Sequence, residues 1–167
     1  VPSLVRDRLR GVAGRVRGGD HVGAGREPKA RALVGRAADI EGGYSDDPAV
    51  VGEVAAQVID AGAVGVNLED GDRDPAVLCA KIEAVRGAAA RAGVALYLNA
   101  RTDVYLRGLA SASTRVESTL ARAARYRDAG ADGIFVPGVV AADEIAGLVA
   151  GLRLPLNVMA RPQLPPA

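Results

Sequence analysis

The chain has 167 residues, of which 49% are hydrophobic and 25% charged, which is typical of one globular domain with a sizeable core. A net charge of +1 and only 3% aromatic residues argue against a nucleic-acid-binding protein. The longest uncharged run is about ten residues, whereas a membrane span needs about 20, and a single cysteine excludes an internal disulfide. We therefore expect a cytoplasmic protein with no membrane or nucleic-acid partner.

The scarcity of two residue types restricts the chemistry further. With His21 as its one histidine, the chain cannot build a histidine-rich zinc site, and a Ser-His-Asp triad would have to use that residue. Schiff-base catalysis would need a lysine at a strand end. Both lysines, Lys29 and Lys81, fall in sequence typical of helices, so we do not expect covalent lysine chemistry.

The chain divides into three parts of different character. Residues 1–35 are rich in arginine and glycine and contain no clear strand, so we predict a divergent, weakly structured N-terminal segment. The G-A-G at 23–25 lacks the third glycine of a dinucleotide-binding loop. Residues 36–160 repeat a strand followed by an amphipathic helix, and the tail at 161–167 is rich in proline.

The repeated unit in residues 36–160 predicts five strands and four helices. The expected strands lie at 36–41, 63–70, 94–101, 133–137 and 155–160. A helix begins at Asp46 or Asp47 with Pro48 in its first turn, and a second runs from Asp74 to Gly93. Two more helices are expected at 114–129 and 142–152. Strands that alternate with helices at this interval predict an α/β protein with a parallel sheet.

Polar side chains gather at the C-terminal ends of these strands. Because side chains alternate between the two faces of a strand, the following groups share a face: Asp39 with Glu41, Asn67 with Glu69, Asn99 with Arg101 and Asp103, and Asn157 alone on the last strand. This edge is where parallel α/β sheets and barrels build their sites. One acidic pair would be unremarkable as a solvated strand end, but three consecutive strands with this feature favour a functional site.

The residue types at this edge indicate which ligands would bind. Asp39, Glu41 and Glu69 offer only carboxylate oxygens, which suit Mg²⁺ or Mn²⁺. Arg101 is suited to a carboxylate or phosphate, and the alternative for it is an ion pair with Asp103 or Glu69. A metal and an arginine together would bind a small anionic oxo-acid and stabilise a developing enolate.

Five ordered motifs resemble the isocitrate lyase/phosphoenolpyruvate mutase superfamily. They read A-D-I-E-G-G-Y, G-A-V-G-V-N-L-E-D-G, L-N-A-R-T-D-V, A-G-A-D-G-I-F-V-P-G and P-L-N-V-M-A, and they span residues 37–160. The resemblance implies a TIM (β/α)₈ barrel and a Mg²⁺-dependent lyase that cleaves C–C or C–P bonds of small 2-oxo or 2-hydroxy acids through an enolpyruvate-like intermediate. With about five clear strands, we expect an incomplete barrel, from a truncated or N-terminally disrupted member of this superfamily.

The resemblance also implies roles for individual residues. Asp39 resembles the direct metal ligand, Glu41 the acid that acts through water, and Glu69 the metal carboxylate of the second strand. Arg101 resembles the arginine that holds the substrate. The predicted substrate-binding residues are Arg101, Asn99, Asn157, Gly42 and Gly43. The predicted catalytic residues are Arg101, Glu41 and Asn157. We expect a small anionic carboxylate as substrate and a homo-oligomer as the assembly.

Several departures from the superfamily keep other readings open. Its lyases carry a K-[KR]-C-G-H loop with a catalytic cysteine, where this chain has E-D-G-D-R-D-P. Cys79 falls inside the helix that follows, so we predict that it belongs to the hydrophobic core and is not a nucleophile. The gating loop of the mutases is not evident, and F-V-P-G replaces an expected glutamate near Pro137. A hydrolase or decarboxylase therefore stays open. Two further alternatives also stay open: an impaired fragment that binds metal without turnover, and an open five-stranded receiver-like domain.

Overall fold

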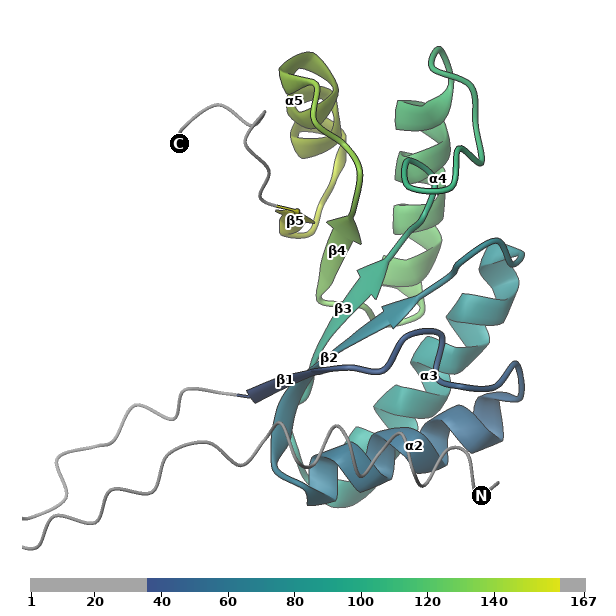
Figure 1. Cartoon of the computed structure of the whole chain (residues 1–167). Helices are drawn as coiled ribbons and strands as arrows, with labels where there is room; N and C mark the ends of the chain where they lie inside the picture. Colours follow the sequence, from purple (N-terminus) through teal and green to yellow (C-terminus); the bar gives the residue numbers. More distant parts are fainter. Residues whose placement is uncertain (1–35, 160–167) are drawn as a thin grey trace, which may run out of the picture.

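The computed structural model describes residues 36–159, within which five parallel strands alternate with four helices (Figure 1). The strands are β1 (Arg36–Asp39), β2 (Ala63–Glu69), β3 (Tyr97–Arg101), β4 (Gly133–Val136) and β5 (Leu156–Val158). The helices are α2 (Pro48–Asp60), α3 (Pro75–Ala92), α4 (Arg115–Asp128) and α5 (Ala142–Gly151). Every strand and helix predicted from the sequence is confirmed within a few residues of its expected bounds. The predicted N-terminal segment and the tail lie outside the described residues.

The caps explain why the helices begin and end where they do. Asp47 caps α2 by accepting a hydrogen bond from the Ala49 amide at 2.9 Å, and Asp74 caps α3 in the same way at 2.7 Å from Ala76. Each aspartate precedes a proline in the first turn, where the missing N–H costs nothing. At the end of α3, Gly93 adopts a left-handed conformation with φ of 66°.

The sheet order identifies the architecture. The strands pair in the sequential order β1-β2-β3-β4-β5, all parallel. Consecutive helices pack against one another along one side of the sheet (Figure 1). A receiver-like domain would place a strand out of sequence and helices on both faces, so this alternative was wrong. Sequential strands with helices on one side are the arrangement of a (β/α)₈ barrel wall, and the described residues form part of one.

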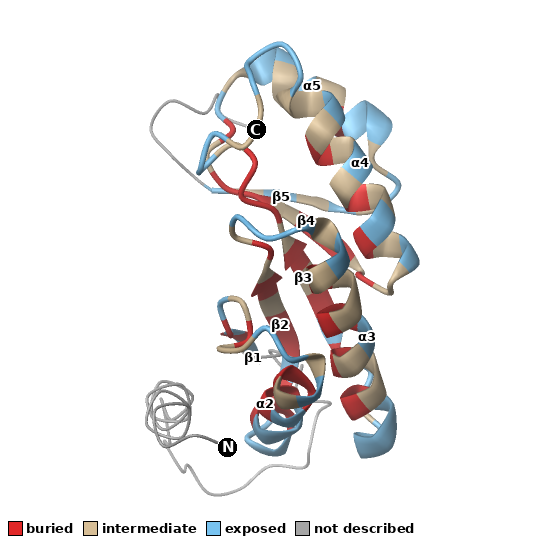
Figure 2. Cartoon of the chain, turned by 90° about the vertical axis from the view of Figure 1, so that its right-hand side faces the viewer, coloured by how far each residue is buried: buried red, intermediate tan, exposed pale blue. Residues whose placement is uncertain are grey.

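The core lies between the sheet and the helices (Figure 2). The strand side chains that face the helices are fully or almost fully buried: Ala38, Ile40, Val66, Leu68, Leu98, Ala100, Ile134 and Val136. The opposite face corresponds to the inside of a barrel and carries the polar residues of the predicted site. No helix within residues 36–159 combines the length and the apolar character needed to cross a bilayer.

Substituting Gly43 by alanine tests the turn that leads from β1 to α2. The φ of Gly43 is +80°, and a Cβ there would lie 2.7 Å from both methyl groups of the fully buried Val51. Valine in a helix has little rotamer freedom to move away. We expect Gly43→Ala to lower the free energy of unfolding by about 2–4 kcal/mol, because backbone strain and overpacking add.

Gly62 provides a matched control for this substitution. Its φ is +91°, but a Cβ there would meet nothing within 4 Å. Gly62→Ala should therefore cost only the backbone strain, about 1–2 kcal/mol. Equal losses for the two variants in urea unfolding would show that Val51 does not restrict the turn.

Candidate active site

The predicted site residues lie on the inner face of the sheet, in two adjacent rows. The register places Asp39 beside Asn67, Asn67 beside Asn99, and Asn99 beside Gly133. Two residues further along the strands, Glu69 lies beside Arg101, Arg101 beside Phe135, and Phe135 beside Asn157. The alternation predicted from the sequence thus brings the polar groups of four strands onto one surface.

Three asparagine side chains form a hydrogen-bonded row across this surface. The Asn99 amide donates to Asn67 Oδ1 at 3.0 Å, and the Asn157 amide donates to Asn99 Oδ1, also at 3.0 Å. The second bond crosses β4 diagonally, because Asn99 lies beside Gly133 whereas Asn157 lies beside Phe135. A Cβ at Gly133 would collide with Tyr97 Oη and lie 3.0 Å from Asn99 Oδ1, so a side chain in this position would force both groups to shift.

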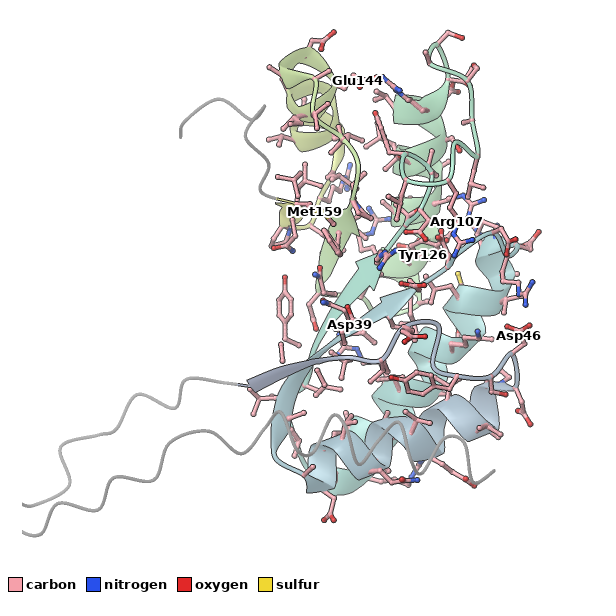
Figure 3. The ribbon with its side chains drawn as sticks, viewed as in Figure 1. Asp39, Asp46, Arg107, Tyr126, Glu144 and Met159 are labelled. Atoms are coloured by element: carbon pink, nitrogen blue, oxygen red, sulfur yellow. The ribbon has the colours of Figure 1, made fainter. Side chains whose placement is uncertain are left out.

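Two carboxylates lie next to one another where β1 and β2 end. Figure 3 shows Asp39 at the end of β1, and its Oδ1 accepts a hydrogen bond from the Glu41 amide at 2.9 Å. The Glu69 side chain is 17% exposed. Burial raises the pKa of Glu69, Arg101 opposes this shift, and repulsion from the Asp103 and Asp39 carboxylates adds to it. The Asp39 charge thus disfavours ionised Glu69, an effect that a cation between the two carboxylates would relieve.

Arg101 is held by two carboxylates. Its Nε and Nη2 donate to Asp103 Oδ1 and Oδ2 at 2.7 and 3.2 Å, and its Nη1 is 2.7 Å from Glu69 Oε2. Burial opposes the charge of the guanidinium, but the bonds and charges of its acidic partners outweigh it and raise the pKa of Arg101. The ion pairs considered as the alternative for Arg101 are thus present, and Asp103, with no exposed side-chain surface, fixes the orientation of the guanidinium.

The loop after β1 makes an unusual turn. Glu41 and Tyr44 have φ of 50° and 60°, which is uncommon for residues with a side chain, and Gly43 between them is also left-handed. The Glu41 side chain is exposed, while its backbone oxygen accepts a hydrogen bond from the Glu69 amide at 3.0 Å. The turn therefore continues the pairing of β1 with β2 beyond the last residue of β1.

The donor set at this edge fits Mg²⁺ in kind. Within residues 36–159, no three acidic, histidine or cysteine side chains converge as a ready-made metal cage. Mg²⁺ is usually held by one or two carboxylates, with water and substrate completing its shell. The Asp39 and Glu69 carboxylates, at the ends of neighbouring strands, meet that requirement, and the exposed Glu41 side chain lies on the loop that follows β1.

An open hollow of about 330 Å³ lies where β1 and β2 end. It is lined by the loops that follow these two strands and by side chains from α3 and the β3–α4 segment: Glu41, Gly42, Tyr44, Ser45, Asp46, Glu69, Asp70, Gly71, Asp72, Arg73, Lys81 and Arg107. Three of the predicted site residues, Glu41, Gly42 and Glu69, line it. Gly43 is buried against Val51 instead.

Sequence reasoning considered Asp103 only as an ion-pair partner of Arg101, and it assigned no role in the site to the charged residues Arg107 and Lys81. Asp103 orients Arg101, Arg107 also contacts Asp103 at 3.0 Å, and Lys81 reaches the hollow from α3. The pattern D-V-Y-L-R places Asp103 and Arg107 four residues apart, a spacing that could have indicated their contact. No local pattern indicates the position of Lys81.

Cys79 has the place that the sequence predicted for it. It lies in α3, half-buried, and packs against the core. Burial raises the pKa of its thiol, so the reactive thiolate is scarce at neutral pH.

Comparison with known proteins gives a consistent family. Residues 32–167 match the family model described as phosphoenolpyruvate phosphomutase. Uncharacterised proteins from two strains of Mycobacterium tuberculosis, CDC 1551/Oshkosh and H37Rv, are each 40% identical to the chain over 131 residues, covering 75% of this chain and 46% of theirs. The chain therefore spans about half the length of the curated relatives that it matches.

Solved structures lead to the same group. A protein of Burkholderia cenocepacia J2315, provisionally named a phosphonomutase, has a TM-score of 0.71 and 43% identity, covering 77% of this chain and 55% of that one. A 2,3-dimethylmalate lyase of the PEP mutase/isocitrate lyase superfamily has a TM-score of 0.66 and 26% identity, with coverage of 78% and 46%. An oxaloacetate acetylhydrolase has a TM-score of 0.63 and 27% identity, with coverage of 73% and 43%. The chain belongs to the phosphoenolpyruvate phosphomutase family, within the PEP mutase/isocitrate lyase superfamily.

Proposed function

We propose that the protein is a Mg²⁺-dependent lyase-type enzyme that acts on a small 2-oxo or 2-hydroxy carboxylic acid, at a C–C or C–P bond and through an enolpyruvate-like intermediate. The observation that carries this proposal is the meeting of Asp39, Glu69 and Arg101 on one face, at the C-terminal ends of three adjacent strands. The names of two similar proteins, a 2,3-dimethylmalate lyase and an oxaloacetate acetylhydrolase, support a small carboxylic acid as the substrate class.

Asp39 and Glu69 are the residues that would hold the metal in this proposal, with Glu41 acting through water. Bound Mg²⁺, or Mn²⁺, would supply Lewis-acid polarisation of the oxygen next to the scissile bond. Glu69 is paired with Arg101 in the described structure, and a cation next to Glu69 would compete with the guanidinium for this carboxylate. Cation binding would thereby release Arg101 Nη1 for another anion.

Arg101 would bind the carboxylate of the substrate. Its Nε and Nη2 remain on Asp103, which is buried and needs a positive partner, so Asp103 keeps the guanidinium plane fixed. The released Nη1 then faces the inner surface, where Asn99 and Asn157 offer amide groups to further substrate oxygens. In this arrangement the Gly42 backbone would border the substrate on the β1 side, whereas Gly43 is buried against Val51.

A second candidate is a protein that keeps the metal-binding residues but does not turn over substrate. The observation that favours it is the open inner face of the sheet within residues 36–159, which carries Tyr97, Asn99 and Asn157. Tyr97 is 43% exposed there, whereas a closed barrel would bury this position. This candidate predicts binding of metal and substrate analogue without product.

Product analysis distinguishes the two candidates. We would incubate the protein with Mg²⁺ and a panel of C4 to C6 2-hydroxy and 2-oxo acids and a phosphonate, and follow the products by NMR. We expect turnover that chelation of Mg²⁺ abolishes and that Asp39→Ala, Glu69→Ala and Arg101→Ala each abolish. Turnover that survives all three substitutions would place the site elsewhere. Metal-dependent binding without any product would support the second candidate instead.

A further inference from the structure

Lys81 is a buried cation outside the group of residues assigned to the site. Its side chain is 4% exposed, although it belongs to α3 and lies near the surface loops that line the hollow. Lysine is almost never buried without partners, because an ammonium group loses its hydration. Both partners of Lys81 lie outside α3: Nζ donates to the Gly42 oxygen at 2.9 Å and to Asp46 Oδ1 at 3.1 Å.

Both acceptors belong to the loop between β1 and α2. Figure 3 shows the course of this loop from Asp39, at the strand, to Asp46, next to α3. The Gly42 oxygen lies inside the left-handed turn, between Glu41 and Gly43. Left-handed residues with side chains are strained, so the turn persists only if its surroundings hold it. A charged donor on the central carbonyl is such a restraint.

The restraint reaches the carboxylates of the site through the backbone. On one side of the Gly42 carbonyl, the Glu41 amide donates to Asp39 Oδ1 at 2.9 Å. The Glu41 oxygen also accepts from the Glu69 amide at 3.0 Å. The position of the Glu41 backbone therefore sets the orientation of the Asp39 carboxylate. It also sets how far this carboxylate lies from Glu69, at the end of β2.

Asp46 connects the same ammonium to the second loop of the hollow. While Oδ1 of Asp46 accepts from Lys81, its Oδ2 pairs with Arg73 Nε at 3.1 Å, in the loop that follows β2. The hydrogen bond from Lys81 lowers the pKa of Asp46, so this carboxylate stays ionised. The Lys81 ammonium thus contacts the loop that follows β1 directly, and it is connected through Asp46 to the loop that follows β2.

We propose that Lys81 is a positioning residue of the candidate metal site, whose ammonium holds the β1–α2 loop so that Asp39 and Glu41 lie next to Glu69. This role rests on the proposed function. It does not make Lys81 a ligand or a catalytic group, because its ammonium donates to a backbone carbonyl and to Asp46. Replacing a residue that orients metal ligands in this way typically weakens metal binding about 10- to 100-fold.

The test compares Lys81→Met, which removes the charge and keeps the length, with Lys81→Arg, which keeps a cation. We would measure Mg²⁺ affinity in the presence of oxalate by calorimetry, and amide hydrogen exchange by mass spectrometry. We expect Lys81→Met to weaken Mg²⁺ binding about 10- to 100-fold and to speed exchange in residues 41–46 without affecting residues 97–101. Lys81→Arg should restore part of both properties.

Val85→Ala is the matched control, because Val85 is fully buried one turn further along α3 and its side chain has no polar group that could hydrogen-bond to the loop. It should lower stability while residues 41–46 and Mg²⁺ affinity stay unchanged. The proposal is overturned if Lys81→Met leaves loop exchange at the wild-type level, or changes exchange and affinity no more than Val85→Ala. Absence of Mg²⁺ and oxalate binding in the wild-type protein would contradict the proposed function, whereas loop exchange would still decide whether Lys81 holds the loop.

Discussion

Asp70→Ala is expected to lower the free energy of unfolding by about 3–5 kcal/mol, the usual cost of removing one partner from a buried ion pair. Asp70 is 3% exposed, and its Oδ2 is 2.8 Å from Arg122 Nη1. The remaining donors to this carboxylate are Thr102 Oγ1 at 2.8 Å, Tyr126 Oη at 2.6 Å and the Asp103 amide at 2.9 Å. Alanine would leave all these donors without an acceptor.

Graded variants make this prediction sharper. Burial and the Asp70 charge both raise the pKa of Tyr126, so its phenol stays protonated and remains a donor. Tyr126→Phe removes one donor to the charged carboxylate and keeps the ion pair, and should cost about 1.5–3 kcal/mol. Asp72→Ala, at an exposed aspartate two residues away, should cost less than about 0.5 kcal/mol. Urea unfolding that gives the same loss for Asp70→Ala and Asp72→Ala would contradict the importance of the buried network.

Arg101→Lys is expected to weaken oxalate binding by the Mg²⁺-loaded protein about 100-fold, within the 2–5 kcal/mol that a buried charge partner contributes. A lysine ammonium cannot satisfy both oxygens of Asp103 and also face the substrate, as the planar guanidinium does. Calorimetric titration with oxalate at fixed Mg²⁺ measures the difference. The protein should stay folded, because Asp103 retains Arg107 as a partner.

Arg107→Lys is the control for this second prediction. Arg107 contacts the same Asp103 at 3.0 Å, but its side chain is 48% exposed, and exposed pairs contribute about 0–1 kcal/mol. We expect less than about a tenfold change in oxalate affinity from this substitution. If Arg107→Lys and Arg101→Lys weaken oxalate equally, Arg101 has no special role in binding the anion.

The sequence predicts the architecture well because its signals are local. Aspartate followed by proline marks the starts of α2 and α3, and alternation along β2 correctly separates Glu69 on the inner face from Asp70 on the helix side. The same alternation predicts which carboxylates and amides share a surface. Periodicity and capping depend only on near neighbours, and the tertiary structure leaves them unchanged here.

The contacts that stabilise the site depend on distant residues and could not be predicted in the same way. Asp70 meets Arg122 across 52 positions, and Lys81 meets Gly42 across 39. The Asn99 to Asn157 bond requires the register that places Asn99 beside Gly133 and Asn157 beside Phe135. Such pairs are set by how helices and loops pack on the sheet, for which a single sequence carries no local pattern.

A thermal melt with Mg²⁺, oxalate, both or neither tests the central claim most directly. Oxalate is a planar dianion that resembles enolpyruvate, and a ligand that binds only the folded state adds about 2.7 kcal/mol at 100 times its dissociation constant. We predict a cooperative transition whose midpoint rises clearly only when Mg²⁺ and oxalate are both present, and does not rise in Asp39→Ala. A midpoint that is the same under all four conditions would show that the carboxylates and Arg101 do not form a metal-dependent anion site in this chain.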